Sequence, residues 1–340
     1  MNMPRKVATL TLCGLLLSVM AHAQQDDEAL AVARSLIQQK RNTEAIAQLK
    51  ALALRRPGMR GIHRELGLAY YHEGEYFEAA RYLQDAWKED PEDRDAAQLL
   101  GLSYYSSGRP AEAIPALEKV RLWHPNSSID AVYILGLCYI MTKNYQQARE
   151  TFAQLYGVSA ASAAAHLLLG RLLLRQGFDP VAEKESKTAL SLSPQLPLAH
   201  LTLGEFSVYK GDYLKAAEEF QAELALNPMC APAFTHLGDL YWRQGRYEDS
   251  LRVLQRSISL DSTASEPYVI IGKVQFRQGL LALAERSLLH AVDMDPSSYT
   301  AHYFLGQLYR DTDRAAAAAR EMNTAARIQQ LQGFNGDRNR

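Results

Sequence analysis

Histidine is the residue type in this sequence that could most readily bind a metal ion. Four histidines share one position relative to a glycine four residues later: His63, His166, His200 and His302. One Zn²⁺ ion would need each imidazole nitrogen about 2 Å away. His166 and His200 are 34 residues apart, and stacked helix pairs would separate them by about 10 Å. We therefore expect these histidines to pack between helices, and we expect no metal ion and no cofactor.

Cysteine could supply a nucleophile or a disulfide. Cys13 lies in an apolar N-terminal run, which leaves Cys138 and Cys230 in the rest of the chain. A disulfide requires Cα atoms within about 7 Å, whereas stacked helix pairs would hold these two about 25–30 Å apart. We expect two free thiols, with Cys230 the more exposed.

Motifs of common enzymes are missing from the sequence. It contains no G-x-S-x-G elbow, no P-loop and no H-E-x-x-H zinc motif. The formal net charge is −1, and no basic block occurs. Nucleic-acid binding proteins usually carry a basic patch, so we expect no nucleic-acid partner.

Glycine shows how the chain is organised. One series recurs every 34 residues, with a single step of 35: Gly67, Gly101, Gly136, Gly170, Gly204, Gly238, Gly272 and Gly306. A second series follows seven residues later: Gly74, Gly108, Gly177, Gly211, Gly245 and Gly279. Alanine keeps a third phase, twelve residues after the first glycine, and proline marks the end of most periods. This spacing predicts a row of similar units that stack on one another.

The residue types at these positions predict pairs of antiparallel helices. Glycine of the first series and the later alanine have almost no side chain, so two helix backbones can approach closely there. Glycine of the second series suits the end of a helix, where a left-handed residue is favoured. Proline follows the second helix, which cannot continue through it. Nine units fit the sequence: 26–59, 60–93, 94–128, 129–162, 163–196, 197–230, 231–264, 265–298 and 299–332.

A 34-residue period with these glycine, aromatic, alanine and proline positions resembles the tetratricopeptide repeat family. The resemblance covers roughly residues 26–332. It implies an all-α fold, a right-handed superhelical solenoid of antiparallel helix pairs. It also implies that the first helix of each pair, helix A, lines a concave face on which a partner protein or peptide binds.

The side chains expected on this concave face change along the chain. Residues 60–162 place apolar and tyrosine side chains there, whereas residues 163–298 place charged and aromatic ones. Aromatic and arginine side chains are the usual energetic anchors of interfaces. We predict an extended partner segment, apolar at one end and acidic at the other. The predicted contacts are Tyr71, Tyr105, Tyr133, Arg171, Arg175, Tyr209, Asp239, Trp242, Arg243, Lys273, Phe276 and Arg277.

Packing is the alternative role for these side chains. Trp242 and the arginines could instead hold helix A against the next unit. Tyrosines three residues after the first glycine are interpreted as packing residues: Tyr70, Tyr104, Tyr139, Tyr241 and Tyr309. Family members that clamp a partner's C-terminal carboxylate use a lysine at the fifth position and an asparagine at the ninth position of one unit. No unit here has both, which disfavours that mode.

The first 23 residues have the features of a signal peptide. Arg5 and Lys6 precede an apolar run at 7–20, and Ala21-His22-Ala23 fits a cleavage site. An uncleaved anchor is the alternative, but the run is short for one, and no later stretch resembles a membrane span. We expect a protein exported to the periplasm or secreted, with a mature chain from Gln24.

Two interruptions break the regular pattern. The extra residue lies within 126–128, and residues 156–162 replace the usual end of a unit, which predicts either a change of curvature or only a different loop. A polar tail, 333–340, leaves no room for a catalytic domain after the last unit. We expect a non-enzymatic scaffold or adaptor. The alternative is a self-assembling component, such as a homodimer, or an envelope or polysaccharide assembly factor that acts through the C-terminal helix.

Overall fold

The computed structural model describes residues 24–123, 129–177 and 180–337, which form helices joined by short turns, with no β-strand among them. The expected all-α fold class is therefore confirmed. The predicted signal peptide at 1–23 and the extra residue at 126–128 lie outside the described residues. No helix among those described is both long and apolar enough to cross a bilayer.

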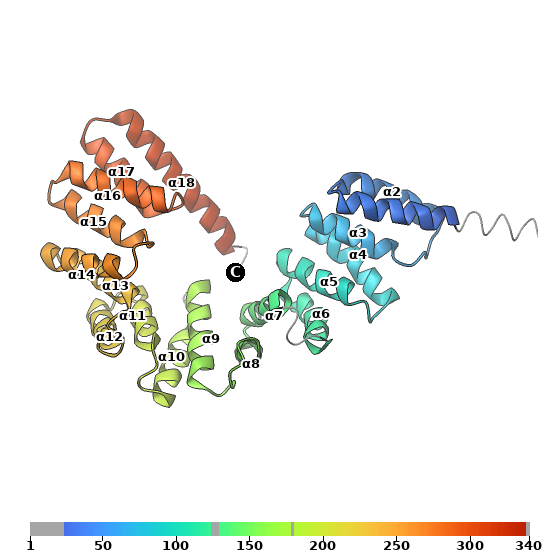
Figure 1. Ribbon diagram of the computed structural model, residues 1–340, viewed down its shortest axis with the longest axis horizontal. Coiled ribbons are helices and arrows are strands. Elements are labelled where there is room, and N and C mark those ends of the chain that lie inside the picture. Colours follow the sequence, from blue (N-terminus) through green and yellow to red (C-terminus); the bar gives the residue numbers. More distant parts are fainter. Residues whose placement is uncertain (1–23, 124–128, 178–179, 338–340) are drawn as a thin grey trace, which may run out of the picture. The chain divides into compact units, whose positions relative to one another are not determined.

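Helices alternate along the chain between two sets, A and B (Figure 1). The A set comprises residues 24–38, α3 (Ile62–His72), α5 (Arg94–Ser106), α7 (Ile129–Met141), α9 (Ala163–Gln176), α11 (Ala199–Tyr209), α13 (Ala231–Arg243), α15 (Glu266–Arg277) and α17 (Tyr299–Asp311). The B set comprises α2 (Asn42–Arg55), α4 (Tyr76–Glu89), α6 (Pro110–Trp123), α8 (Tyr145–Leu155), α10 (Pro180–Leu192), α12 (Tyr213–Leu226), α14 (Tyr247–Leu260), α16 (Leu281–Met294) and α18 (Ala315–Asp337).

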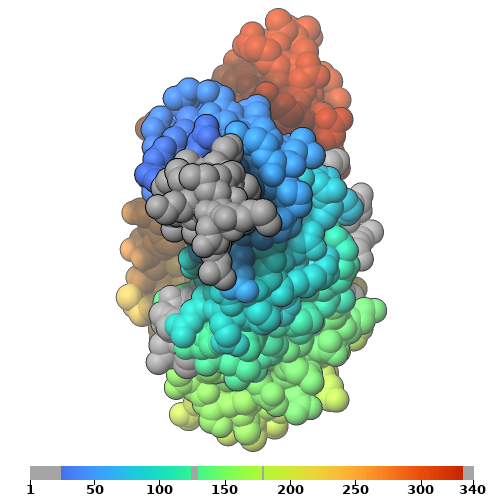
Figure 2. Space-filling view, turned by 90° about the vertical axis from the view of Figure 1, so that its right-hand side faces the viewer, coloured from blue at the N-terminus to red at the C-terminus, as the bar shows by residue number. Residues whose placement is uncertain are grey.

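The chain divides into two compact units, Met1–Leu155 and Tyr156–Arg340. The division falls at the start of 156–162, where the sequence pattern is interrupted. Within each unit a B helix packs against its own A helix and against the next A helix. Neighbouring A helices also pack together, as α3 does with α5 and α13 with α15. Figure 2 shows the N-terminal unit as successive bands in chain order. The A helices therefore form one continuous row in each stack.

Glycines of the first series lie where the two helices of a pair cross. A Cβ atom added to Gly204 would lie 2.4 Å from Phe220 Cε1, and one added to Gly101 would lie 2.4 Å from Leu117 Cγ. Both of these B-helix side chains are fully buried. A large side chain of helix B therefore rests directly on the backbone of helix A, which confirms the predicted close approach.

The turn from helix A to helix B contains a residue with positive φ in every described case. Glycines of the second series take this conformation, for example Gly245 at 73°. Three positions in the same phase lack glycine and are also left-handed: Lys40 (61°), Lys143 (60°) and Asp313 (57°). The turn geometry is thus kept where the sequence has no glycine, at the cost of backbone strain.

The last helix, α18, closes the C-terminal unit. Ala318, Ala325 and Ile328 are buried on its inner side, where it packs against α17. Its exposed side chains up to residue 331 are alanine, arginine, asparagine and glutamine, apart from Leu331. A polar outer face of this kind is typical of a terminal capping helix.

Candidate functional site

The four in-phase histidines pack between A and B helices, as expected. Three of them pair through Nδ1 with a glutamate that follows 19 residues later. These pairs are His166–Glu185 (2.6 Å), His200–Glu219 (2.7 Å) and His302–Glu321 (2.6 Å). His63 instead pairs with Glu89. Within the described residues, no group of three or more His, Cys, Asp or Glu side chains could hold a metal ion.

Both described cysteines are free and buried. Cys230 is only marginally the more exposed, at 4% against 0% for Cys138, because it packs against Leu201 and Leu237 in the core between α11 and α13. Burial raises the pKa of Cys138 to about 12 and also raises the pKa of Cys230. Neither thiol is poised as a nucleophile at neutral pH.

In the N-terminal unit, the predicted contact residues lie on three successive A helices and are half-buried. Tyr71 on α3 packs edge-on against Tyr76, with ring centroids 5.5 Å apart. Tyr133 on α7 packs in the same manner against Phe152 at 5.6 Å. Burial raises the pKa of Tyr105 on α5. Each of these tyrosines therefore serves packing as well as offering part of its surface.

In the C-terminal unit, Asp239 on α13 joins two of the predicted basic residues. Its Oδ1 oxygen accepts a hydrogen bond from Lys273 Nζ at 2.8 Å, and its Oδ2 oxygen accepts one from Arg243 Nε at 2.6 Å. Burial opposes ionisation of this carboxyl, but Lys273 and Arg243 outweigh it and lower its pKa. Lys273 is only 6% exposed. Its charge is matched inside the protein and is not presented to a ligand.

Trp242 lies beside this ion pair and is half-buried. The ammonium group of Lys273 lies 3.7 Å from the centre of a Trp242 ring, close enough for a cation–π interaction. The ring of Phe304 on α17 meets the indole edge-on at 6.4 Å. The indole Nε1 is buried and has no hydrogen-bond partner among the described residues. Trp242 therefore ties α13 to α15 and α17.

Phe276 and Tyr209 differ in their surroundings. Phe276 on α15 is half-buried and packs against the apolar core of the last helix pairs, so its main role is packing. Tyr209 ends α11 and is 63% exposed. It is the most accessible of the predicted aromatic contacts in this unit.

Three predicted arginines form no ion pair with any described residue: Arg171, Arg175 and Arg277. Arg171 on α9 is half-buried, whereas Arg175 and Arg277 lie at the ends of α9 and α15 and are exposed. The structure therefore divides the predicted basic residues into two groups. Lys273 and Arg243 pair with Asp239, whereas Arg171, Arg175 and Arg277 have no ion partner among the described residues.

One charged pair on these helices was not predicted. His236 on α13 stacks on Phe220 at 4.9 Å, and its Nε2 lies 3.3 Å from Glu205 Oε1 on α11. Burial would lower the pKa of His236, but the hydrogen bond with Glu205 and the charges of Glu266, Glu205 and Asp239 raise it. His236 lies outside the phase of the other histidines, so their periodicity could not reveal it.

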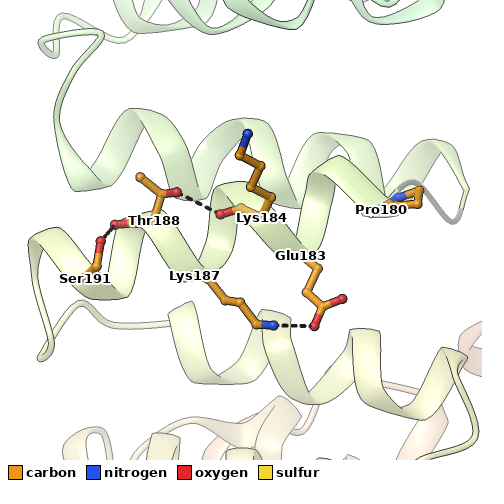
Figure 3. A pocket seen from close by; sticks show the side chains of 6 residues that line it. All are labelled: Pro180, Glu183, Lys184, Lys187, Thr188 and Ser191. Carbon is orange, nitrogen blue, oxygen red and sulfur yellow. Dashed lines mark hydrogen bonds and ion pairs between the residues drawn. The ribbon is translucent and has the colours of Figure 1, made fainter.

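A shallow depression runs along the B helix α10 (Figure 3), lined by Pro180, Glu183, Lys184, Lys187, Thr188 and Ser191. Glu183 bonds to Lys187 Nζ at 2.7 Å and to Lys210 Nζ at 2.6 Å. These hydrogen bonds lower the pKa of Glu183 to about 2. Because this surface lies on the B helix α10, it is separate from the predicted contact residues, which lie on the A helices.

Comparison with protein-family models identifies the family of this chain. A tetratricopeptide repeat model matches residues 30–94, 201–265 and 271–331, and a second model of the same description matches 70–138 and 104–172. The chain belongs to the tetratricopeptide repeat family. Proteins of this family are generally non-enzymatic modules that bind other proteins.

Solved structures of related fold were also found. Yeast Tom70 is 14% identical with a TM-score of 0.49, over 92% of this chain and 81% of that one. Pseudomonas aeruginosa PilF is 17% identical with a TM-score of 0.46, over 61% and 97%. The APC/C hetero-tetramer Cut9–Hcn1 is 18% identical with a TM-score of 0.45, over 82% of this chain and 55% of that one. Among curated proteins, none matches the sequence.

Proposed function

We propose that this protein is a non-enzymatic scaffold or adaptor that binds an extended segment of a partner protein along its A helices. The acidic part of that segment binds the C-terminal unit. The observation that supports this proposal is the exposure of Arg175 and Arg277, neither of which has an ion partner in the described part of the chain.

Side-chain chemistry supports an acidic ligand at this surface. Arginine can hold a carboxylate through two parallel hydrogen bonds. Tyr209 and the accessible part of Trp242 add aromatic surface near the cationic side chains, and this combination is enriched at interface hot spots. Asp239 does not compete with the ligand's carboxylates for Arg175 or Arg277, because its two oxygens bind Lys273 and Arg243.

We also propose that the protein is exported to the periplasm or secreted, with residues 1–23 removed. Support comes from the charged start, the apolar run and the small residues at Ala21 and Ala23. Cell fractionation with intact-mass measurement tests this. A product that begins at Gln24 outside the cytoplasm is expected, and an intact N-terminus in the cytoplasm would contradict it.

The binding surface is tested with a fluorescein-labelled peptide of alternating glutamate and leucine, and with its glutamine counterpart. Fluorescence anisotropy at low salt should show tighter binding of the glutamate peptide. Arg175→Ala/Arg277→Ala should weaken that binding by about tenfold or more and reduce its salt dependence, because rim charges act mainly through long-range attraction.

Matched controls come from the B helices. Arg286 on α16 and Arg320 on α18 are exposed, and neither forms an ion pair with a described residue. Arg286→Ala/Arg320→Ala removes the same net charge from a different surface. If this control loses as much affinity as the A-helix variant, attraction is non-specific and the proposed surface is wrong.

Self-assembly through α18 remains the alternative. A polar and alanine-rich outer face, with Leu331 as its one exposed large apolar side chain up to residue 331, does not favour stacking of two copies. Sedimentation of the purified protein and of Leu331→Asp separates the two readings. A wild-type dimer that dissociates in the variant would support self-assembly.

A further inference from the structure

A hollow lies between the first helix pair of the N-terminal unit and α3. It has a volume of about 560 Å³ and is lined by Ile37, Gln38, Lys40, Asn42, Leu68 and His72. This volume is within the usual range for ligand pockets. Its wall is apolar where the buried Ile37 and the half-buried Leu68 lie, and the exposed Gln38, Lys40 and His72 contribute the polar part.

Asn42 explains why the hollow exists. It is the first residue of the B helix α2, and four later B helices begin with tyrosine in the same phase of the repeat: Tyr76, Tyr145, Tyr213 and Tyr247. A tyrosine at residue 42 would fill part of this space. The shorter asparagine leaves it open.

Contacts of the later tyrosines show what the hollow is shaped to hold. The ring of Tyr213 lies 5.3 Å from the guanidinium carbon of Arg243, which also donates a hydrogen bond to the tyrosine hydroxyl at 3.3 Å. Arg243 follows Tyr213 by 30 residues, and the residue 30 positions after Asn42 is His72. His72 lines the hollow.

A second tyrosine contact in a later helix pair also has an equivalent position at the hollow. Tyr76 packs against Tyr71, five residues before it. The residue five positions before Asn42 is Ile37, which also lines the hollow. The positions of both contacts therefore line the hollow, where they hold His72 and Ile37, while no tyrosine among the described residues lines it.

Asn42 also lacks a hydrogen bond that a ligand could provide. Its residue is 6% exposed, and its side-chain Oδ1 is buried with no hydrogen-bond partner among the described residues. A buried carbonyl oxygen without a donor is uncommon and costly. Because this oxygen is shielded in the empty hollow, the Asn42 amide must turn toward the hollow before a hydroxyl group on an incoming ring can supply the missing donor.

We infer that this hollow binds a tyrosine side chain of a protein partner. The ring takes the place that Tyr76 and Tyr213 occupy in later helix pairs, and the hydroxyl hydrogen-bonds to the Asn42 amide. The inference rests on the proposed function only in that the occupant belongs to another protein. It does not depend on the arginines of the C-terminal unit.

The test uses 4-fluorophenol as a probe of the tyrosine side chain and fluorobenzene as a probe without the hydroxyl. Binding to the purified full chain is followed by ¹⁹F NMR titration. The wild-type protein should bind 4-fluorophenol saturably and more tightly than fluorobenzene. Asn42→Tyr fills the hollow and should weaken 4-fluorophenol binding at least tenfold. Asn42→Ala keeps the space and should abolish the preference for the hydroxyl.

Further variants make the outcome decisive. Tyr76→Asn should open an equivalent hollow at the second helix pair, so each chain should bind one additional probe molecule. If Asn42→Tyr does not fold, His72→Trp covers the opening from an exposed position and should also block binding. Arg175→Ala/Arg277→Ala should bind the probe as the wild type does, so failure of the acidic-peptide proposal leaves this test intact.

Three results would overturn the inference. They are equal probe binding by wild type and the filled variants, equal binding of the two probes by wild type, and a change of oligomeric state in Asn42→Tyr without any probe binding. The last result would assign the hollow to a segment of a second copy of this chain.

Discussion

The ammonium group of Lys273 lies 2.8 Å from Oδ1 of Asp239, a residue 34 positions earlier on the neighbouring A helix. Both side chains are largely buried, with 8% and 19% of their surfaces exposed. Removing one member of such a pair leaves a buried charge without a partner, which costs far more than replacing both members. The pair therefore joins α13 to α15 while making each residue depend on the other.

Asp239→Asn should lower the free energy of unfolding of the C-terminal unit by about 3–5 kcal/mol. Asp239→Asn/Lys273→Met should restore most of that loss, because the buried charge is then absent. Trp242 is the one tryptophan after residue 123. In a background in which Trp87 and Trp123 are replaced by phenylalanine, its fluorescence therefore reports the unfolding of the C-terminal unit in urea. Equal losses in the single and double variants would show that the two residues are not coupled.

His236 should make the stability of the same unit depend on pH. Its pKa is raised in the folded protein, so the stabilisation is complete below the unfolded pKa of about 6.5 and is lost as pH rises through the folded value. Urea midpoints should therefore fall above pH 6.5. His236→Gln should flatten this change, whereas His290→Gln, at an exposed position on α16, should leave it in place. A wild-type midpoint that stays constant from pH 6 to 9 would exclude the effect.

Gly204→Ala should destabilise the protein although alanine is the better helix former. The gain in helix propensity is about 1 kcal/mol, but the new Cβ would lie 2.4 Å from Phe220 Cε1. Overpacking of this kind costs about 1–3 kcal/mol, so thermal unfolding should occur at a lower temperature. Gly204→Ala/Phe220→Leu should recover part of the loss if the clash is the cause.

Lys143→Gly should stabilise the N-terminal unit. Lys143 has a φ of 60° in the turn before α8, a conformation that costs an L-residue about 1–2 kcal/mol. Part of that gain is offset by the greater freedom of glycine in the unfolded chain, so the expected net change is about 0.5–1 kcal/mol. Lys143→Ala is the matched control: it removes the same side chain but keeps the strain, and it should not stabilise.

The fold could be predicted because its signals are local. Gly204 and Gly245 belong to two glycine series, and each series recurs for steric reasons that act within a single helix pair. The period of these series then implies that the helix pairs stack on one another. The A-helix contacts were predicted by position, but the role of Lys273 was not, because its partner Asp239 lies in the preceding unit. Matching charges at equivalent positions of neighbouring units would have suggested it. The hollow at Asn42 was missed because it depends on an asparagine at a position where four later B helices have a tyrosine.

Asn42 also has a consequence for alignment of a bound chain. Within the N-terminal unit, where the A helices present similar apolar and tyrosine side chains, a ligand could bind in several similar positions, offset by about 8–10 Å, the distance between packed helices. A ligand could then shift by one helix pair with little change in its binding free energy. A hollow that binds one specific side chain would remove this degeneracy. A tyrosine seated there would determine which residue of the partner faces each later helix of the N-terminal unit.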